Sequence, residues 1–145
     1  MEFFGRINFM NEPIKTKTRV FKLLSFVLFV LAILHFLGVK FYLDWVYSWY
    51  DMVLHFLGGV AVGLFAIWVF EHISGYNLWT NIRILIWGLV MVLTVGVLWE
   101  IFEIYVGFTD FGDGMQYVTD TISDLVLDSV GGILGLIYGL KTRNE

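Results

Sequence analysis

The sequence predicts an all-α membrane protein, a bundle of four transmembrane helices with its N and C termini in the cytoplasm. The composition supports this class, because 59% of the 145 residues are hydrophobic and only 15% are charged, with a mean hydropathy of +0.79. A soluble domain averages about 45–50% apolar and about 25% charged residues. The apolar residues also gather in four runs, each near the length of about 20 residues that crosses a bilayer. The chain has no cysteine, which excludes disulfides and thiolate chemistry.

The four predicted spans follow one another in a single transmembrane domain, residues 20–140. They are residues 20–39, 51–70, 82–106 and 118–140, between a cytoplasmic N-terminal arm, 1–19, and a cytoplasmic tail, 141–145. The first span is too long for the apolar region of a signal peptide, and no small-x-small cleavage site follows it. Between the first two spans, Lys40–Tyr50 concentrates the Tyr and Trp residues typical of a membrane interface, so we expect an interfacial helix there.

The basic residues predict the orientation of the bundle. Eight of the nine Lys and Arg residues fall in the N-terminal arm with the first-span entrance, in the second-to-third connection and in the tail: Arg6, Lys15, Lys17, Arg19, Lys22, Arg83, Lys141 and Arg143. The other two connections hold only Lys40. Because cytoplasmic loops carry an excess of Lys and Arg, both termini are expected in the cytoplasm. We therefore expect a multi-pass protein of the plasma or inner membrane.

The fourth predicted span carries three carboxylates within an apolar sequence. Asp120, Asp124 and Asp128 are spaced four residues apart, which is close to one helical turn, so they form a column on one face. Carboxylates within a membrane span are energetically costly and usually functional. The column therefore predicts where the chemistry of the protein lies.

Two further spans present ionisable side chains on one face and at a similar depth. Asp51 and His55 are four residues apart in the second span, and Glu100 and Glu103 are three apart in the third. A rise of about 1.5 Å per residue places these groups and Asp124 roughly 22–30 Å from the cytoplasmic ends of their spans. We infer that they form one cluster in the outer half of the bilayer, facing the interior of the bundle.

The charge balance of this cluster favours a bound cation. Nine of the 13 acidic residues lie in the outer half or the outer loops: Asp44, Asp51, Glu100, Glu103, Asp110, Asp113, Asp120, Asp124 and Asp128. Closely spaced carboxylates in a poorly solvated site cannot all stay ionised unaided. An oxygen-rich site with an imidazole suits a divalent metal such as Mg²⁺, Mn²⁺, Ca²⁺ or Zn²⁺. The alternatives are a protonated, hydrogen-bonded core that holds the helices together and a proton or cation pathway.

Glycines predict close helix packing in the inner half of the bundle. Gly131, Gly135 and Gly139 follow one another at four-residue intervals in the fourth span, and Gly59 and Gly63 do so in the second. Such small-residue spacings let helices approach closely. Close packing there, with bulkier acidic groups in the outer half, would make a cleft that is closed toward the cytoplasm and open toward the outside of the cell. The simpler alternative is that glycine is common in membrane helices.

A lone histidine and an Asp- and Gly-rich segment are weaker indications of function. His35 stands alone on an apolar helix, which is typical of a packing or hydrogen-bonding residue, and only its depth suggests the cluster. The segment Asp110–Gly114, D-F-G-D-G, resembles part of a calcium loop but lacks the third ligand and the closing glutamate. A lid or a plain turn is the favoured reading.

Three motifs of the chain resemble those of the VanZ-like and YjdF-like membrane families. They are W-Y-D-M-V-L-H-F-L-G-G at residues 49–59, W-E-I-F-E at 99–103 and D-T-I-S-D-L-V-L-D-S-V-G-G-I-L-G at 120–135. The resemblance covers residues 49–139 and implies a cell-envelope role related to glycopeptide resistance. It implies functional positions at Asp51, His55, Glu100, Asp120 and Asp124. The chain departs from the VanZ-like pattern at Asp128, where Asn is often found, and lacks the Arg that commonly follows the glutamate of the family.

The predicted function is an outward-facing carboxylate and histidine site that binds a divalent metal ion and acts on or senses an envelope lipid. In an enzyme of this kind, we expect metal-assisted hydrolysis at a lipid head group. The expected metal ligands are Asp51, His55, Glu100 and Asp124, with Glu103 or Asp120 as the base that activates a metal-bound water. The alternatives are a proton or cation transporter subunit and an accessory protein without catalysis. The expected partners are a membrane lipid and a second copy of the chain, which would associate through the Gly-rich helix faces. No binding of nucleic acid is expected.

Overall fold

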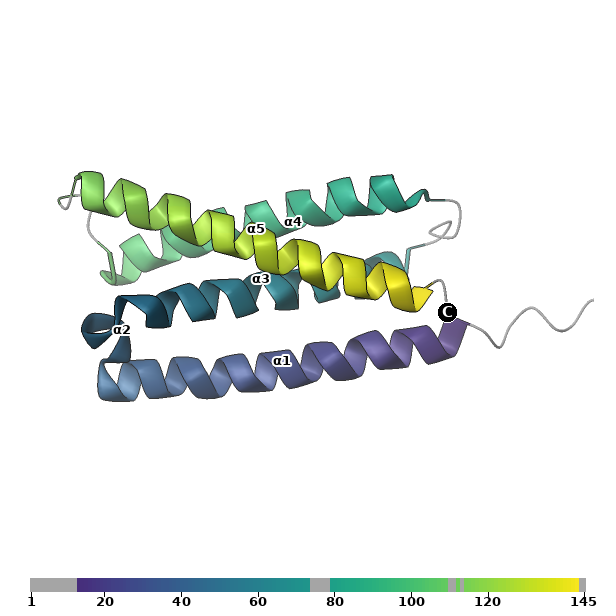
Figure 1. Ribbon diagram of the computed structural model, residues 1–145, viewed down its shortest axis with the longest axis horizontal. Helices are drawn as coiled ribbons and strands as arrows, with labels where there is room; N and C mark the ends of the chain where they lie inside the picture. Colours follow the sequence, from purple (N-terminus) through teal and green to yellow (C-terminus); the bar gives the residue numbers. More distant parts are fainter. Residues whose placement is uncertain (1–12, 74–78, 110–111, 113, 144–145) are drawn as a thin grey trace, which may run out of the picture.

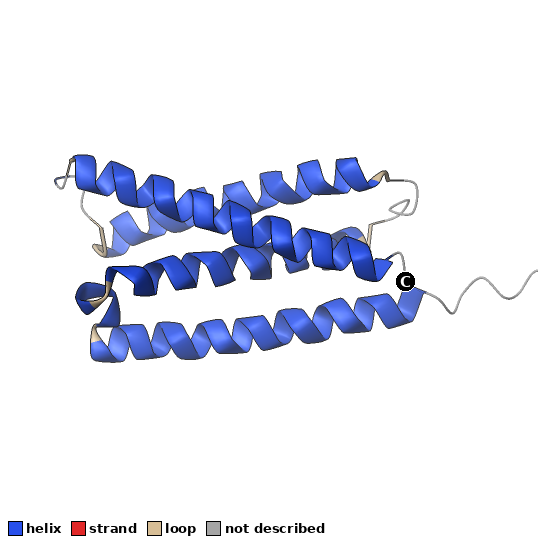
Figure 2. Cartoon of the chain, viewed as in Figure 1, coloured by secondary structure: helices blue, strands red, loops and turns tan. Residues whose placement is uncertain are grey.

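The computed structural model confirms the four-helix, all-α fold. It describes residues 13–73, 79–109, 112 and 114–143, and no strand occurs among them (Figures 1 and 2). The helices are α1 (Pro13–Phe41), α2 (Leu43–Val46), α3 (Ser48–Phe70), α4 (Asn81–Val106) and α5 (Met115–Arg143). The four long helices are each long and apolar enough to cross a membrane. The protein is therefore a multi-pass membrane protein.

The four long helices run side by side along the long axis of the molecule (Figure 1). α3 and α5 make the most extensive contact of any two helices, while α1 packs mainly on α3 and α4 packs on both α5 and α3. The start of α1 and the end of α5 lie at the same end of the bundle, which we call the terminal end (Figure 1). The short helix α2 lies at the other end, which we call the α2 end. The two ends of the described chain therefore share one side of the membrane, and its assignment to the cytoplasm stays a prediction.

The central pair α3 and α5 approaches closely because glycines face the opposite backbone. A Cβ atom on Gly59 would collide with the backbone of Asp128, and one on Gly131 would collide with the carbonyl oxygen of Phe56. A Cβ on Gly135 would stand only 2.6 Å from the carbonyl oxygen of Val60. The glycine spacings are thus used for packing within one chain. Self-association through the same faces stays a prediction.

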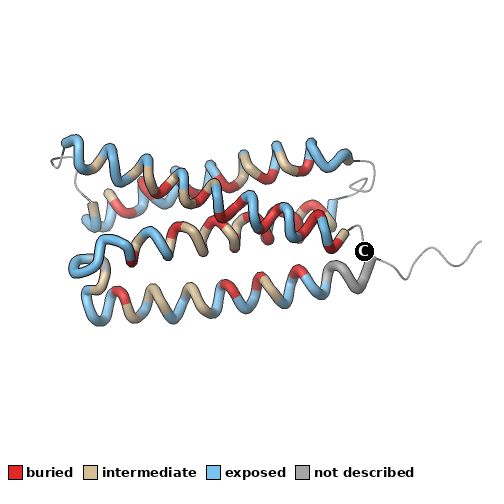
Figure 3. The backbone as a smooth tube through the Cα atoms, in the orientation of Figure 1, coloured by how far each residue is buried: buried red, intermediate tan, exposed pale blue. Residues whose placement is uncertain are grey.

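The apolar core fills the half of the bundle nearer the terminal end. It combines residues of all four long helices, among them Val20, Leu64, Ile67, Ile84 and Leu136, which are fully buried. Figure 3 shows the buried residues on the sides of the helices that face one another, with exposed residues on the outside. Many of those exposed residues are large and apolar, as expected of a surface solvated by lipid.

The helices are longer than the predicted spans. α1 begins at Pro13, a residue type favoured at the first helical position, and so takes in the last part of the predicted arm. α3 begins at Ser48, and α5 extends from Met115 to Arg143. The predicted spans followed the apolar residues, but a helix continues through polar residues that hydropathy does not mark.

The segment Lys40–Tyr50 is helical except at Tyr42 and Tyr47, which divide it into three pieces. α1 continues to Phe41, and Tyr42 then adopts a left-handed conformation with φ 55° that ends the helix. The four residues of α2 follow, and the extended Tyr47 leads into α3. The predicted interfacial helix is therefore a single short turn. Most of the predicted N-terminal arm, the end of the tail and most of the D-F-G-D-G segment lie outside the described residues.

Candidate metal site

The candidate site lies toward the α2 end, where α3, α4 and α5 bring ionisable side chains together. His55 on α3 is 5% exposed, and its Nε2 lies 3.7 Å from Oδ1 of Asp51, one turn earlier on the same helix. This Nε2 is buried and has no hydrogen-bond partner. A buried nitrogen without a partner is energetically costly, so it marks a position where a ligand would be stabilising.

Glu100 on α4 presents a second buried atom without a partner. Its side chain is 5% exposed, and its Oε2 accepts a hydrogen bond of 2.8 Å from the hydroxyl of Thr121 on α5. Its Oε1 is buried and has no hydrogen-bond partner. One oxygen therefore ties α4 to α5, while the other remains available to a ligand.

The six predicted site residues form three overlapping groups. Each group holds three residues whose potential ligand atoms all lie within 4.8 Å of one another. The groups are His55, Glu100 and Asp124; Asp51, His55 and Glu103; and Asp51, Asp120 and Asp124. All four predicted ligands and both predicted bases thus lie in one neighbourhood. The first group is the only one of the three with all members buried.

Glu103 is held by a tryptophan of its own helix. Trp99 precedes Glu103 by one helical turn, and its indole N–H donates a hydrogen bond of 2.9 Å to Oε1 of the carboxylate. His35 on α1 packs edge-on against the same indole, with ring centroids 6.1 Å apart. His35 belongs to none of the three groups formed by the described residues. It contacts the site through Trp99.

Asp128 lies deeper in the bundle than the three groups and contacts His55 from the other side of the ring. Its Oδ2 lies 3.5 Å from Nδ1 of His55, and the residue is 7% exposed. The sequence placed Asp128 on the acidic column but left its role open. Neither this contact nor the Thr121 contact followed from spacing, because both depend on how the helices are rotated about their axes.

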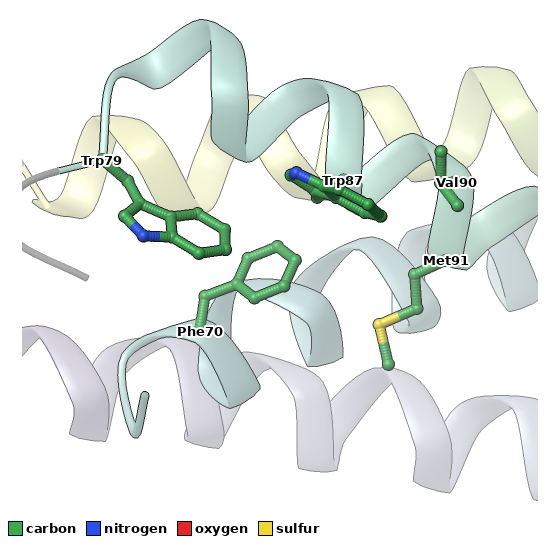
Figure 4. A pocket seen from close by; sticks show the side chains of 5 residues that line it. All are labelled: Phe70, Trp79, Trp87, Val90 and Met91. Carbon is green, nitrogen blue, oxygen red and sulfur yellow. The ribbon is translucent and has the colours of Figure 1, made fainter. Parts of the chain in front are cut away.

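Two apolar hollows in the described part of the chain lie outside this cluster. One, of about 400 Å³, lies toward the terminal end and is lined by Phe70, Trp79, Trp87, Val90 and Met91, whose side chains Figure 4 shows. Another, of about 530 Å³, runs along α3 beside the cluster and is lined by Trp49, Met52, Val53, Phe56, Leu57 and Leu127. Both are lined by apolar residues, and neither includes a member of the three groups.

The fold and this cluster define a class, a multi-pass helical membrane protein with buried carboxylates and an imidazole between its spans. The chain belongs to a family described as "Predicted membrane protein (DUF2238)", whose model matches residues 13–145. No curated protein and no solved structure matches the chain.

Proposed function

We propose that the protein binds a divalent cation through Asp51, His55, Glu100 and Asp124 and uses it at the head group of a membrane lipid. The observation that carries the proposal is the pair of buried atoms without a hydrogen-bond partner, Nε2 of His55 and Oε1 of Glu100. They come from different helices, and both residues belong with Asp124 to one buried group. A cation between them would supply the missing interaction for both atoms at once.

The donor set and its dimensions fit a metal ion. Ligand atoms at about 2.0–2.2 Å from one ion stand at most roughly 4.4 Å apart. The atoms of each group lie within 4.8 Å of one another, so small side-chain movements suffice to close around an ion. Carboxylates with an imidazole are common ligands of Zn²⁺ and other divalent transition metals. The cation would also offset the repulsion among the closely spaced carboxylates.

The apolar groove beside the cluster supports a lipid as the partner. Its residues Met52 and Phe56 directly follow Asp51 and His55 in the sequence, and Leu127 precedes Asp128. An acyl chain lying in this groove would bring its head group to the level of the cluster. The resemblance to the VanZ-like and YjdF-like families, which implies a cell-envelope role, is a further argument for a lipid of the envelope.

In a hydrolase of this kind, one of the two remaining carboxylates of the cluster would act as the general base. A metal ion lowers the pKa of a bound water and so supplies a nucleophile at neutral pH. Glu103 or Asp120 would then accept the proton of that water, since each shares a group with Asp51. Glu103 is buried and held by Trp99, whereas Asp120 is exposed at the α2 end.

Metal analysis of purified protein tests the site. Protein in detergent is equilibrated with Zn²⁺ or Mn²⁺, freed of excess ion and analysed for bound metal. We expect at least one ion per wild-type chain and loss of that ion in His55→Ala and Asp124→Asn. His72→Ala is the matched control, because His72 is exposed near the terminal end and its ring contacts the backbone of Trp68. Wild-type protein without bound ion, or binding that survives both site variants, would refute the metal site.

Reconstitution into phospholipid vesicles tests what the site does. Metal-loaded protein should release the lipid head group into solution, and either Glu103→Gln or Asp120→Asn should abolish that release while retaining the ion. Release undiminished in both variants would exclude these two bases. Cation flux across the vesicles that depends on Asp124, without release of any head group, would instead favour the transporter alternative.

A further inference from the structure

We propose that Asp128 is the positioning residue of His55. It accepts a hydrogen bond from the Nδ1–H group of the imidazole and thereby leaves Nε2 to face the carboxylates as a metal ligand. The effect of Asp128 on metal binding rests on the proposed metal site. The orientation of the ring can be tested without any ion. Asp128 would touch neither the metal nor the substrate.

The geometry about the imidazole supports this division of roles. Nδ1 of His55 lies 3.5 Å from Oδ2 of Asp128, and Nε2 lies 3.7 Å from Oδ1 of Asp51. The ring therefore stands between a deep carboxylate and the cluster nearer the α2 end. Only Nε2 is buried without a hydrogen-bond partner, so the two nitrogens are already unlike in the structure. An Nδ1 without a proton would direct its lone pair at a carboxylate oxygen, which is repulsive when that carboxylate is ionised.

Asp128 can reach this position because Gly96 leaves room for its carboxylate and Gly59 leaves room for its backbone. A Cβ on Gly96 of α4 would stand 2.6 Å from Oδ2 of Asp128, too close for any real side chain. A Cβ on Gly58 of α3 would stand 3.9 Å from Oδ1, an ordinary contact. On α3, Gly59 faces the backbone of Asp128 itself and lets α5 approach. The packing thus holds the carboxylate against the histidine.

This arrangement serves a known purpose in metal sites. A histidine ligand usually donates its other ring N–H to a carboxylate or carbonyl, which fixes the tautomer and makes the ligating nitrogen more basic. Removal of such an outer partner typically lowers metal affinity by about 10–100-fold without removing a ligand. Asp128 also has a position that suits the role, buried at 7% exposure and outside all three groups of potential ligands.

Nitrogen NMR of histidine-labelled protein tests the tautomer directly. The chain has only three histidines, so His35→Gln and His72→Gln variants assign the signals of His55. In the metal-free wild type, we expect Nδ1 to carry a coupled proton at a pH where Nε2 carries none, which distinguishes this tautomer from the doubly protonated ring. In Asp128→Ala that signal should shift as the ring loses its acceptor. An Nδ1 without a proton in the wild type would overturn the proposal.

Metal titration tests the consequence. We expect Asp128→Ala to bind Zn²⁺ or Mn²⁺ about 10–100-fold more weakly than the wild type, with Asp128→Asn in between because its amide oxygen can still accept. Gly96→Ala should weaken binding as well, since its methyl group displaces the carboxylate, whereas Gly58→Ala should not. Equal affinity in the wild type and Asp128→Ala would refute the positioning role but leave the metal site standing. A wild type that binds no ion would refute the metal site, and the NMR result would still decide the orientation of His55.

Discussion

The two oxygens of the Glu100 carboxylate have different surroundings. Oε2 accepts a hydrogen bond from Thr121, and Oε1 is buried without a partner. Substitution Thr121→Val keeps the shape of the side chain but removes the donor that orients the carboxylate. We expect metal affinity to fall by about 10-fold, the lower end of the effect of losing an outer partner, with the ion count per chain unchanged.

Thr119→Val is the matched control for this prediction. Thr119 lies two residues earlier on α5, is exposed, and its hydroxyl donates to the carbonyl oxygen of Met115. Calorimetric titration of both variants with Zn²⁺ gives the comparison. Weakened binding in Thr119→Val to the same extent would show a general effect on α5 rather than an effect on Glu100.

The sequence carried part of this residue-scale information. The four-residue spacing of Asp51 and His55, and the helical rise that set Glu100 and Asp124 at a similar depth, led to the neighbourhood that the structure describes. The supporting contacts of Thr121, Trp99 and Asp128 were not predictable, because they depend on the rotation of each helix and on side-chain rotamers. Their roles in binding remain predictions for the titrations above.

At the scale of the helices, the crossing of α3 and α5 depends on backbone contact. Gly59 shows this, since a Cβ there would collide with the backbone of Asp128, which cannot move as a flexible side chain could. We expect Gly59→Ala to destabilise the bundle by about 1–3 kcal/mol or more, as overpacking of a tight core does. Thermal unfolding in detergent should show a lower midpoint.

The neighbouring Gly58 provides a closely matched control. A Cβ on Gly58 would make an ordinary contact of 3.9 Å with the carboxylate of Asp128. Gly58→Ala changes the same residue type one position away and should unfold at nearly the wild-type temperature. An equal loss of stability in both variants would argue against a specific α3–α5 backbone contact.

The sequence predicted the elements better than their ends. Four apolar runs and the spacing of Gly59, Gly63 and Gly131 correctly indicated four helices and close packing. Helix ends were less accurate because polar residues such as Gln116 and Thr142 are helical in the structure although hydropathy does not mark them. The left-handed Tyr42 that separates α1 from α2 had no local signal, since Gly or Asn is the usual residue in that conformation.

In the whole molecule, the two halves of the bundle have different packing and chemistry. Toward the terminal end, glycines and buried aliphatic residues bring α3 and α5 into close contact. Toward the α2 end, the same helices carry Asp51, His55 and Asp124 in place of aliphatic residues. The close contact at one end and the acidic side chains at the other are consistent with a site reached from the α2 end. The side of the membrane on which that end lies would therefore decide which leaflet supplies the proposed lipid.

The absence of cysteine makes this orientation directly measurable. Ile73 is 43% exposed in the turn after α3 near the terminal end, and Phe108 is 50% exposed after α4 at the α2 end. In intact cells we expect a membrane-impermeant maleimide to label Phe108→Cys but not Ile73→Cys, because the basic residues predict a cytoplasmic terminal end. Permeabilised cells, where both should react, provide the control. Labelling of Ile73→Cys alone in intact cells would show that the orientation is opposite to the predicted one. The site would then lie on the cytoplasmic side of the membrane.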